Sequence, residues 1–386
     1  MDKKTDKAMN GNMSFGMFLG FFGALLAYLI GAGMASGQEA MQYFTAWGSI
    51  PALLTVMIVN FIVMFCTFMA YTYAGRKGAV DLQTVCEYYV GKKIGMLFTA
   101  FAWIFNACCY LFMISGFGNT MNQQFGIPMW AGCAIAVALS VGTAVFGLSG
   151  IVNIIGKIGP VVVGMLLLLA IIAGIRLFPN IPQGVEIVQS GKLELLRAGA
   201  TPLLGGLSYG GCSVLLVAGY MSKIGKDLSG YKKRYTSSLC LAAALAITVT
   251  VGLLGMCHLG NIEESSQAAI PNLLLANTVF GPGASKVFGP VFAIVILASI
   301  YSTFCPIMWT CVSTVIKDDR SARYKIVCAA VGIAVFIIDM FIPYATLVNV
   351  ILTYCGYTGG IVFAVLSVSW IVRLVKDRRS AGESAE

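Results

Sequence analysis

Apolar residues run along this chain in long blocks that short polar segments separate. A helix of about 18 or more apolar residues can cross a hydrocarbon layer of roughly 30 Å. The pattern therefore predicts an all-α integral membrane protein with ten transmembrane helices. The expected spans, with ends accurate to a few residues, are Phe15–Phe44, Pro51–Tyr73, Ile94–Asn119, Met129–Phe146, Val152–Leu177, Pro202–Met221, Tyr235–Cys257, Val287–Ile316, Tyr324–Phe341 and Ala345–Leu374.

The segments between the spans give no sign of a separate soluble domain. We expect one transmembrane domain over residues 1–386, with cytoplasmic tails at 1–13 and 375–386. The N-terminal stretch has no small-residue cleavage site after a short apolar run, so we expect the first helix to be retained. The connection after the seventh span is apolar but contains Pro271, which predicts a re-entrant or capping segment.

Composition and charge support this picture. Of the residues, 58% are hydrophobic and 11% are charged, and most of the 25 Lys and Arg residues fall on one side of the expected spans. The positive-inside rule then predicts a multi-pass protein of the plasma (inner) membrane with both termini in the cytoplasm. This asymmetry accounts for the net charge of +9, so we expect the lipid bilayer and no nucleic acid as partner.

Glycine-rich stretches interrupt two of the expected helices. The first span contains "IGAGMASGQEAMQYF", Ile30–Phe44, and the sixth contains "TPLLGGLSYGGCSVLLVAGYMSK", Thr201–Lys223. Glycine weakens a helix interior by about 1 kcal/mol relative to alanine. Paired breaks at corresponding positions of two halves indicate a transporter binding site, so we expect helices 1 and 6 to be broken. The alternative is close packing of small residues against neighbouring helices.

The "IGAGMASGQ" stretch resembles the first-helix break of the amino acid–polyamine–organocation (APC) superfamily. The longer "GAGMASGQEAMQYF" is similar to bacterial YkvI-like membrane proteins. The resemblance implies a LeuT-type fold built from a five-plus-five inverted repeat. Repeat one would cover about 14–177 and repeat two about 201–374.

Each break would expose backbone groups of opposite polarity. N–H groups after Ser36–Gly37 would receive an anionic group, and carbonyls from Gly31 to Met34 would face a cation or an ammonium. The break in the sixth span offers the same groups, together with a hydroxyl. This pair of poles predicts a zwitterion such as an amino acid. The expected backbone and hydroxyl contacts are Ala35, Ser36, Gly37, Leu207, Ser208 and Gly210.

Ser299, Ser302 and Thr303 share one face of the eighth span. The resemblance implies a sodium ion there, held by the carbonyls of Gly31, Met34 and Ser299 and by the hydroxyls of Ser302 and Thr303. Na⁺ is the only cofactor that we expect. The alternative is that these hydroxyls bond to the backbone of their own helix.

Lys157 lies about two turns into the fifth span, where an ionisable residue is functional by default. In proton-coupled and exchanging members of the resembled superfamily, a lysine on this helix occupies the place of sodium. Lys157 is thus the alternative coupling group, unless its side chain extends to the cytoplasmic interface.

Glu39 follows the first break, and we expect it at the substrate site. It would pair with an amine, carry a coupled proton or cap the half-helix. Tyr110 and Tyr209 are the expected aromatic walls, since a tyrosine supplies an apolar face and a hydroxyl. Asp339 is expected at the membrane interface.

Together these features predict a secondary transporter that moves an amino acid or a similar small zwitterion or amine by alternating access. Sodium coupling is the first hypothesis, and proton coupling or exchange through Lys157 is the alternative. We expect no enzyme, because His258 is the only histidine and no metalloprotease or hydrolase motif is present. A channel, a transporter-like sensor and a membrane-embedded enzyme are more distant alternatives. The sequence predicts no oligomeric state.

Overall fold

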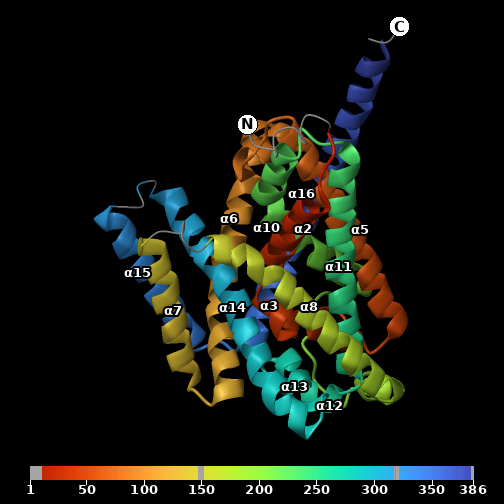
Figure 1. Cartoon of the computed structure of the whole chain (residues 1–386), viewed down its shortest axis with the longest axis vertical. Coiled ribbons are helices and arrows are strands. Elements are labelled where there is room, and N and C mark those ends of the chain that lie inside the picture. Colours follow the sequence, from red (N-terminus) through yellow and green to blue (C-terminus); the bar gives the residue numbers. More distant parts are fainter. Residues whose placement is uncertain (1–10, 147–151, 317, 319–320, 384–386) are drawn as a thin grey trace.

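The structure is a computed structural model that describes residues 11–146, 152–316, 318 and 321–383 (Figure 1). The side chains of residues 146, 152–159 and 378–383 are outside the described part. Every regular element in the described ranges is helical, which confirms the all-α prediction. The helices are α2 (Phe15–Leu29), α3 (Ala32–Ser36), α4 (Gln38–Tyr43), η1 (Thr45–Trp47), α5 (Ile50–Arg76), α6 (Leu82–Phe125), α7 (Met129–Phe146), α8 (Val152–Leu177), η2 (Phe178–Asn180), α9 (Ile181–Gln189), α10 (Pro202–Asp227), α11 (Lys233–Leu259), α12 (Ile262–Ser265), α13 (Pro271–Thr278), α14 (Pro282–Val315), α15 (Ala322–Asp339) and α16 (Tyr344–Glu383).

Seven helical segments in the described ranges are long and apolar enough to cross a membrane. Two shorter apolar helices, Phe15–Leu29 and Met129–Val145, coincide with the first and fourth expected spans, and α15 coincides with the ninth. The multi-pass character is therefore confirmed, while the total of ten spans and the inverted repeat stay predictions. The seven segments are Ile50–Arg76, Leu82–Phe125, Pro160–Gln189, Pro202–Asp227, Lys233–Leu259, Pro282–Val315 and Tyr344–Asp377.

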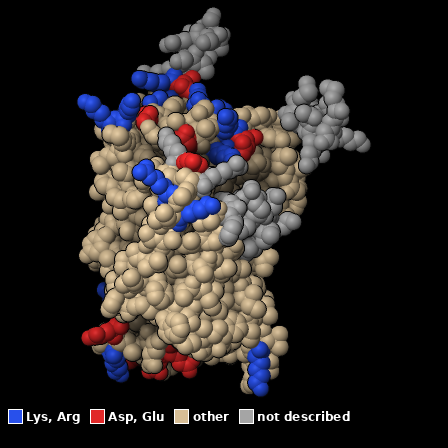
Figure 2. All heavy atoms as spheres, turned by 90° about the vertical axis from the view of Figure 1, so that its left-hand side faces the viewer, with Lys and Arg blue, Asp and Glu red and all other residues tan. Residues whose placement is uncertain are grey.

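The surface between the two ends of the molecule is apolar. Large hydrophobic side chains such as Ile58, Ile175, Val287 and Ile361 are more than half exposed there. On the face shown in Figure 2, the charged side chains gather toward the two ends and leave a wide uncharged band between them. Contiguous exposed apolar surface of this extent fits contact with lipid rather than with water.

The two ends of the helical bundle differ in what covers them. The first and last described residues lie at one end, where the Gly11 carbonyl accepts a hydrogen bond of 3.0 Å from the Lys232 N–H (Figure 1). The short helices α12 and α13 cover the opposite end. Pro271 begins α13, so the apolar connection after α11 forms a helical cap. We call the two ends the termini side and the far side.

The first predicted span is interrupted twice. α2 ends at Leu29, and Gly31 then takes an extended conformation (ψ −170°) before α3 begins. After α3, Gly37 adopts a left-handed conformation with φ of 94°, and α4 follows. Glycine reaches this region without a steric penalty, whereas other residues rarely adopt it. The segment that the sequence singled out thus becomes two short helices in the interior of the bundle.

The sixth predicted span differs from the expectation. α10 is continuous from Pro202 to Asp227, so the break predicted at its glycines is wrong for this structure. The glycines instead permit close approach of neighbouring backbones. A methyl group on Gly211 would overlap the Gly356 carbonyl of α16, and one on Gly206 would lie 2.9 Å from the Val56 carbonyl of α5. Small residues therefore form a packing seam here, as they do in other membrane helix pairs.

α6 begins before the expected third span. Asp81 caps its first turn by accepting a 2.9 Å hydrogen bond from the Thr84 N–H. Gly91 (φ 77°) kinks the helix between its short first part and its long apolar part. The polar part of α6 before Gly91 was predicted as a connection because charged residues interrupt its apolar pattern.

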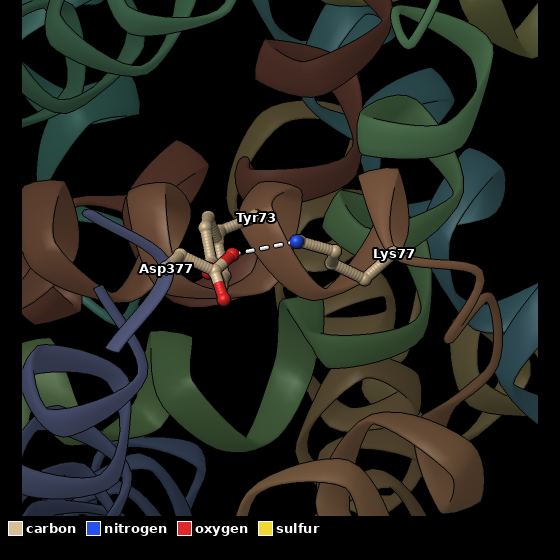
Figure 3. Close-up of polar contacts among 3 residues, drawn as sticks. All are labelled: Tyr73, Lys77 and Asp377. Carbon is tan, nitrogen blue, oxygen red and sulfur yellow. Dashed lines mark hydrogen bonds and ion pairs between the residues drawn. The ribbon is translucent and has the colours of Figure 1, made fainter. Parts of the chain in front are cut away.

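α5 and α16 are joined at the termini side. Lys77 and Asp377 form an ion pair of 2.5 Å, and the Tyr73 hydroxyl donates a 2.6 Å hydrogen bond to the same carboxylate (Figure 3). Both charged side chains are nearly half exposed, so solvent screens the pair and it contributes little to stability.

Candidate functional site

A small cavity of about 60 Å³ lies beside the interruption between α2 and α3. Residues of α2, α4, α5, α6, α10, α11, α14 and α16 line this central cavity, which makes it the natural candidate for a binding site. Its walls are mostly aromatic, aliphatic and sulfur-containing side chains, and Glu39 is the one charged residue among the described ones that line it. The lining includes Tyr28, Gly31, Glu39, Phe105, Cys109, Phe112, Met113, Tyr209 and Thr303.

Glu39 of α4 is held in a defined position in this cavity. Its Oε2 accepts a hydrogen bond of 2.6 Å from the Tyr209 hydroxyl of α10. The side chain lies against Gly33, where an added methyl group would come within 2.9 Å of the carboxylate carbon. Glycine at position 33 therefore makes room for this carboxylate. The expectation that Glu39 and Tyr209 lie at the site fits this geometry.

A second cavity of about 560 Å³ opens on the termini side. Tyr28, Leu216 and Thr303 line both this cavity and the central one. The Tyr28 ring stacks on Tyr220 at 4.6 Å, and its hydroxyl donates a 3.2 Å hydrogen bond to the Leu216 carbonyl. These contacts close the central cavity on this side, so Tyr28 has the position of a gate.

A third cavity of about 580 Å³ lies on the far side, between α4, the end of α12 with the connection after it, and the start of α16. Aromatic packing separates it from the central cavity. The Tyr209 ring lies 4.8 Å from that of Tyr43 and 5.6 Å from that of Phe44, and the Tyr43 and Ser208 hydroxyls are 3.2 Å apart. The central cavity thus lies between two larger cavities at opposite ends, with Tyr28 on one side and the rings of Tyr43, Phe44 and Tyr209 on the other.

Asp339 ends α15 and lines the far-side cavity, where it is buried; its place at the membrane interface stays a prediction. The residue is 1% exposed, and neither carboxylate oxygen has a hydrogen-bond partner among the described residues. The sequence favoured an interfacial position because Asp339 ends an apolar run. The packing of α15 against α6 and α7 buries that helix end.

Several other predicted contacts point away from the central cavity. Ser36 donates to the Gly33 carbonyl (3.0 Å) and lies 2.9 Å from the Tyr344 hydroxyl. Ser208 hydrogen-bonds to the Leu352 and Thr353 carbonyls of α16. The remaining predicted contacts serve packing or caps outside the cavity lining; they are Ala35, Gly37, Leu207 and Gly210.

Tyr110 is buried but faces α7, where its hydroxyl lies 2.6 Å from that of Ser140. The side chains of α6 that line the cavity are Phe105, Cys109, Phe112 and Met113. Their spacing of four, three and one residues defines one helix face, and Tyr110 is rotated by about 100° from Cys109. A search for that spacing around the predicted break could have found this face.

The predicted sodium ligands are only partly brought together. The Ser299 hydroxyl donates a 3.1 Å hydrogen bond to the Ile30 carbonyl across the helix break. The Ser302 and Thr303 hydroxyls donate to the Ser299 carbonyl at 2.7 and 3.1 Å. The first-helix carbonyl next to this cluster is therefore that of Ile30, which precedes the predicted Gly31.

Met34 is occupied on the other side of α3. Its carbonyl accepts a 3.0 Å hydrogen bond from the Asn272 Nδ2, which also donates to Ala35. Asn272 Oδ1 lies 3.0 Å from His258 Nε2, so that nitrogen carries the ring proton. His258, Asn272 and α3 thus form one hydrogen-bonded connection from α11 to the broken helix.

Lys157, the alternative coupling group, lies on α8, but its side chain is outside the described part. The described residues contain no group of three or more His, Cys, Asp and Glu side chains that could hold a metal ion.

Comparisons with known proteins agree with the geometry at the level of the fold. No protein-family model matches the chain. A segment of 143 residues is 26% identical to the uncharacterized protein YyaD of Bacillus subtilis strain 168; the match covers 37% of this chain and 41% of YyaD.

Two solved transporter structures resemble the whole chain. MhsT in complex with L-phenylalanine aligns with 90% of this chain and 88% of its own, at a TM-score of 0.61 and 14% identity. The Eremococcus coleocola manganese transporter, in complex with an aromatic bis-isothiourea substituted compound, aligns with 94% of this chain and 87% of its own, at a TM-score of 0.53 and 15% identity. These similarities show a LeuT-like fold.

Proposed function

We propose that this protein is a secondary active transporter that moves an amino acid or a similar small amine across the membrane by alternating access. The observation that carries the proposal is the small central cavity at the break of the first helix, between larger cavities on the two sides. A solute site that opens alternately to either side needs this arrangement. The L-phenylalanine complex of MhsT, a protein of similar fold, supports an amine-bearing solute.

Sodium is the coupling ion that we propose first. The oxygens of Ser299, Ser302 and Thr303 and the Ile30 carbonyl lie together beside the break. Oxygen atoms are suitable ligands for a small hard cation. The alternative is a proton-coupled symporter or an exchanger in which the Lys157 ammonium takes the place of sodium.

We also propose that the termini side faces the cytoplasm. Basic residues are concentrated in the segments at this side, as the positive-inside rule requires for cytoplasmic loops. The described ones are Arg76, Lys77, Lys92, Lys93, Lys223, Lys226, Lys232, Lys233, Arg234, Arg323, Lys325, Arg373 and Lys376. The far-side cavity would then receive solute from outside the cell.

The test is uptake into liposomes that contain the purified full-length protein. Labelled amino acids and amines are supplied under an inward sodium gradient, under an inward proton gradient without sodium, or with unlabelled solute preloaded. We expect uptake that follows the sodium gradient. Uptake that follows protons or requires preloading would move the coupling to Lys157, and a lack of uptake in all three conditions would overturn the proposed function.

A further inference from the structure

The three cavities share a one-sided charge. Acidic residues line each of them: Glu194 and Asp339 on the far side, Glu39 in the centre and Asp81 on the termini side. No described lining residue of these cavities is Lys or Arg. Arg197 follows a lining residue in the chain but turns to the Ala46 carbonyl and the Trp47 ring. The whole path is therefore electrostatically suited to a cation.

The far-side cavity also contains buried acceptors without donors. Asp339 contributes two carboxylate oxygens that have no partner, at 1% exposure. Gln42, at 2% exposure, contributes a third, its Oε1. The Gln42 NH₂ group donates to Gln38 Oε1 (3.0 Å) and to the Ala345 carbonyl (2.9 Å), which fixes the amide with its oxygen as the free group.

Three unsatisfied acceptors in one cavity indicate a missing donor. A buried polar group without a partner is unfavourable, and a buried charge without one is more so. An ammonium group supplies both the donors and the compensating charge. Water satisfies the hydrogen bonds but leaves the carboxylate charge uncompensated.

In the central cavity the same preference follows from Glu39. The Tyr209 hydroxyl already donates to its carboxylate, which stays the one charged group among the described lining residues. A solute carboxylate would meet this like charge in a site of low dielectric constant. A solute ammonium would form a neutral pair with it, beside the aromatic rings of Tyr28, Phe105 and Phe112.

We propose that the central cavity takes a small organic ammonium ion that lacks a carboxylate, and that Asp339 and Gln42 form the first binding position for it in the far-side cavity. The inference rests on the transport function proposed above and narrows its solute class. It replaces the zwitterion that the sequence predicted with a cation, because Glu39 itself supplies the negative pole of the site.

Binding to the full-length protein in lipid nanodiscs tests the proposal. Isothermal titration compares pairs that differ only by a carboxylate: ethylamine with L-alanine, 3-methylbutylamine with L-leucine, and phenethylamine with L-phenylalanine. Because like-charge contacts cost several kcal/mol, we expect the amine to bind at least about 100-fold more tightly than its partner in each pair that binds. Equal or tighter binding of the amino acids, or no binding by any amine, would overturn the proposal.

Variants locate the two positions. Glu39→Gln is expected to weaken amine binding by at least about 30-fold, since it removes the charge partner of a buried pair. Asp339→Asn is expected to raise the KM for amine uptake about tenfold at unchanged maximal rate, because it acts on entry. Glu263→Gln, an exposed carboxylate on α12 at the same end, is the matched control. Melting temperatures identify any misfolded variant, and Tyr209→Phe then replaces Glu39→Gln as the central test.

A metal titration separates the two kinds of cation. MnCl₂ and NaCl are titrated under the same conditions as the amines. Saturable Mn²⁺ binding that Glu39→Gln abolishes, in a protein that binds no amine, would assign the acidic path to a metal ion and overturn the inference. Gradient-driven uptake of an amino acid without amine binding would overturn this inference alone. Amine binding without uptake of any solute would overturn the transport proposal and leave the binding site standing.

Discussion

The Tyr209 hydroxyl donates a hydrogen bond of 2.6 Å to Glu39 Oε2 and so connects α10 to α4 across the central cavity. The same ring packs against Tyr43 and Phe44, which separate this cavity from the far side. Tyr209 thus contacts both the charged group of the site and the aromatic layer above it. We therefore expect a change in the position of the Glu39 carboxylate to be accompanied by a change in the aromatic packing of Tyr43, Phe44 and Tyr209.

Tyr209→Phe tests this connection. The ring and its packing are retained, but the Glu39 carboxylate loses its phenolic donor. A hydrogen bond to a charged group contributes about 1.5–3 kcal/mol, so we expect uptake to fall by about tenfold or more. The control is Tyr110→Phe, which removes the hydroxyl that faces Ser140. If Tyr110→Phe reduced uptake as much as Tyr209→Phe, the assignment of the cavity wall would fail.

Gly33→Ala is expected to displace Glu39. The new methyl group would lie within 2.9 Å of the carboxylate carbon. Overpacking in a close-packed interior costs about 1–3 kcal/mol, which predicts roughly tenfold weaker solute binding. The comparison is Gly16→Ala on α2, where an added methyl group meets nothing within 4 Å. Equal binding by the two variants would contradict the packing of Glu39 against Gly33.

Tyr220→Ala is expected to open the termini side. The variant removes the ring on which Tyr28 stacks, and such aromatic pairs contribute about 0.5–1.5 kcal/mol. A membrane-impermeant methanethiosulfonate applied from the termini side should then label Cys109 several-fold faster than in the unmodified protein, as mass spectrometry would detect. Cys133, buried between α6 and α7 against Gly118, serves as the reference thiol. Unchanged labelling of Cys109 would show that Tyr28 is not the gate.

Asn272→Asp is expected to destabilise the protein more than Asn272→Ala. The amide donates to the Met34 and Ala35 carbonyls, and an aspartate would instead place a carboxylate against both of them. Loss of a buried donor costs about 1–3 kcal/mol, and repulsion adds to it. Thermal unfolding in nanodiscs provides the measurement. Asn180→Asp, at an exposed position, is the control and should leave the melting temperature unchanged. A melting temperature lower for Asn272→Ala than for Asn272→Asp would refute the proposed contacts.

Thr303→Val tests the sodium hypothesis. The variant keeps the shape of the side chain and removes the hydroxyl oxygen beside Ser299. We expect the sodium concentration for half-maximal uptake to rise about tenfold, since loss of one hydrogen-bonding or ligand oxygen costs on the order of 1–2 kcal/mol. Thr314→Val removes an exposed hydroxyl that bonds within the same helix and should have no effect. Uptake that needs no sodium, is unchanged in Thr303→Val and is lost in Lys157→Gln would favour the alternative coupling group.

The sequence predicted the interruption of the first helix for a sound physical reason. Gly37 adopts a left-handed conformation that other residues avoid, and Gly31 precedes a new helix start. The break predicted in α10 is absent, because Gly211 allows the backbone of α10 to approach Gly356, which lies 145 positions away in the chain. A single sequence contains no signal for which distant segment a glycine faces. Local backbone conformation was therefore more predictable than packing.

The site residues follow the same division. Glu39 was identified because a carboxylate in a membrane span is rare and costly, whatever its neighbours are. Tyr110 was predicted as a cavity wall because a tyrosine supplies an apolar face and a hydroxyl, but helix phase decides which side chain faces the cavity, and Phe112 lines it instead. Asp339 was assigned to the interface because it ends an apolar run. Its burial depends on how α15 packs against α6 and α7, which the sequence does not show. These choices required coordinates.

The glycine seam between α10 and α16 has a mechanical consequence. Because Gly211 and Gly356 bring the two backbones together without intervening side chains, the pair has no flexible layer that could absorb sliding. α5 packs equally closely on α10, at Gly206 and, through its Val63, at Gly210. We therefore expect α5, α10 and α16 to move as a single stiff body. Any displacement that opens one side of the membrane must then be taken up elsewhere, at the short hinged segments of the first span.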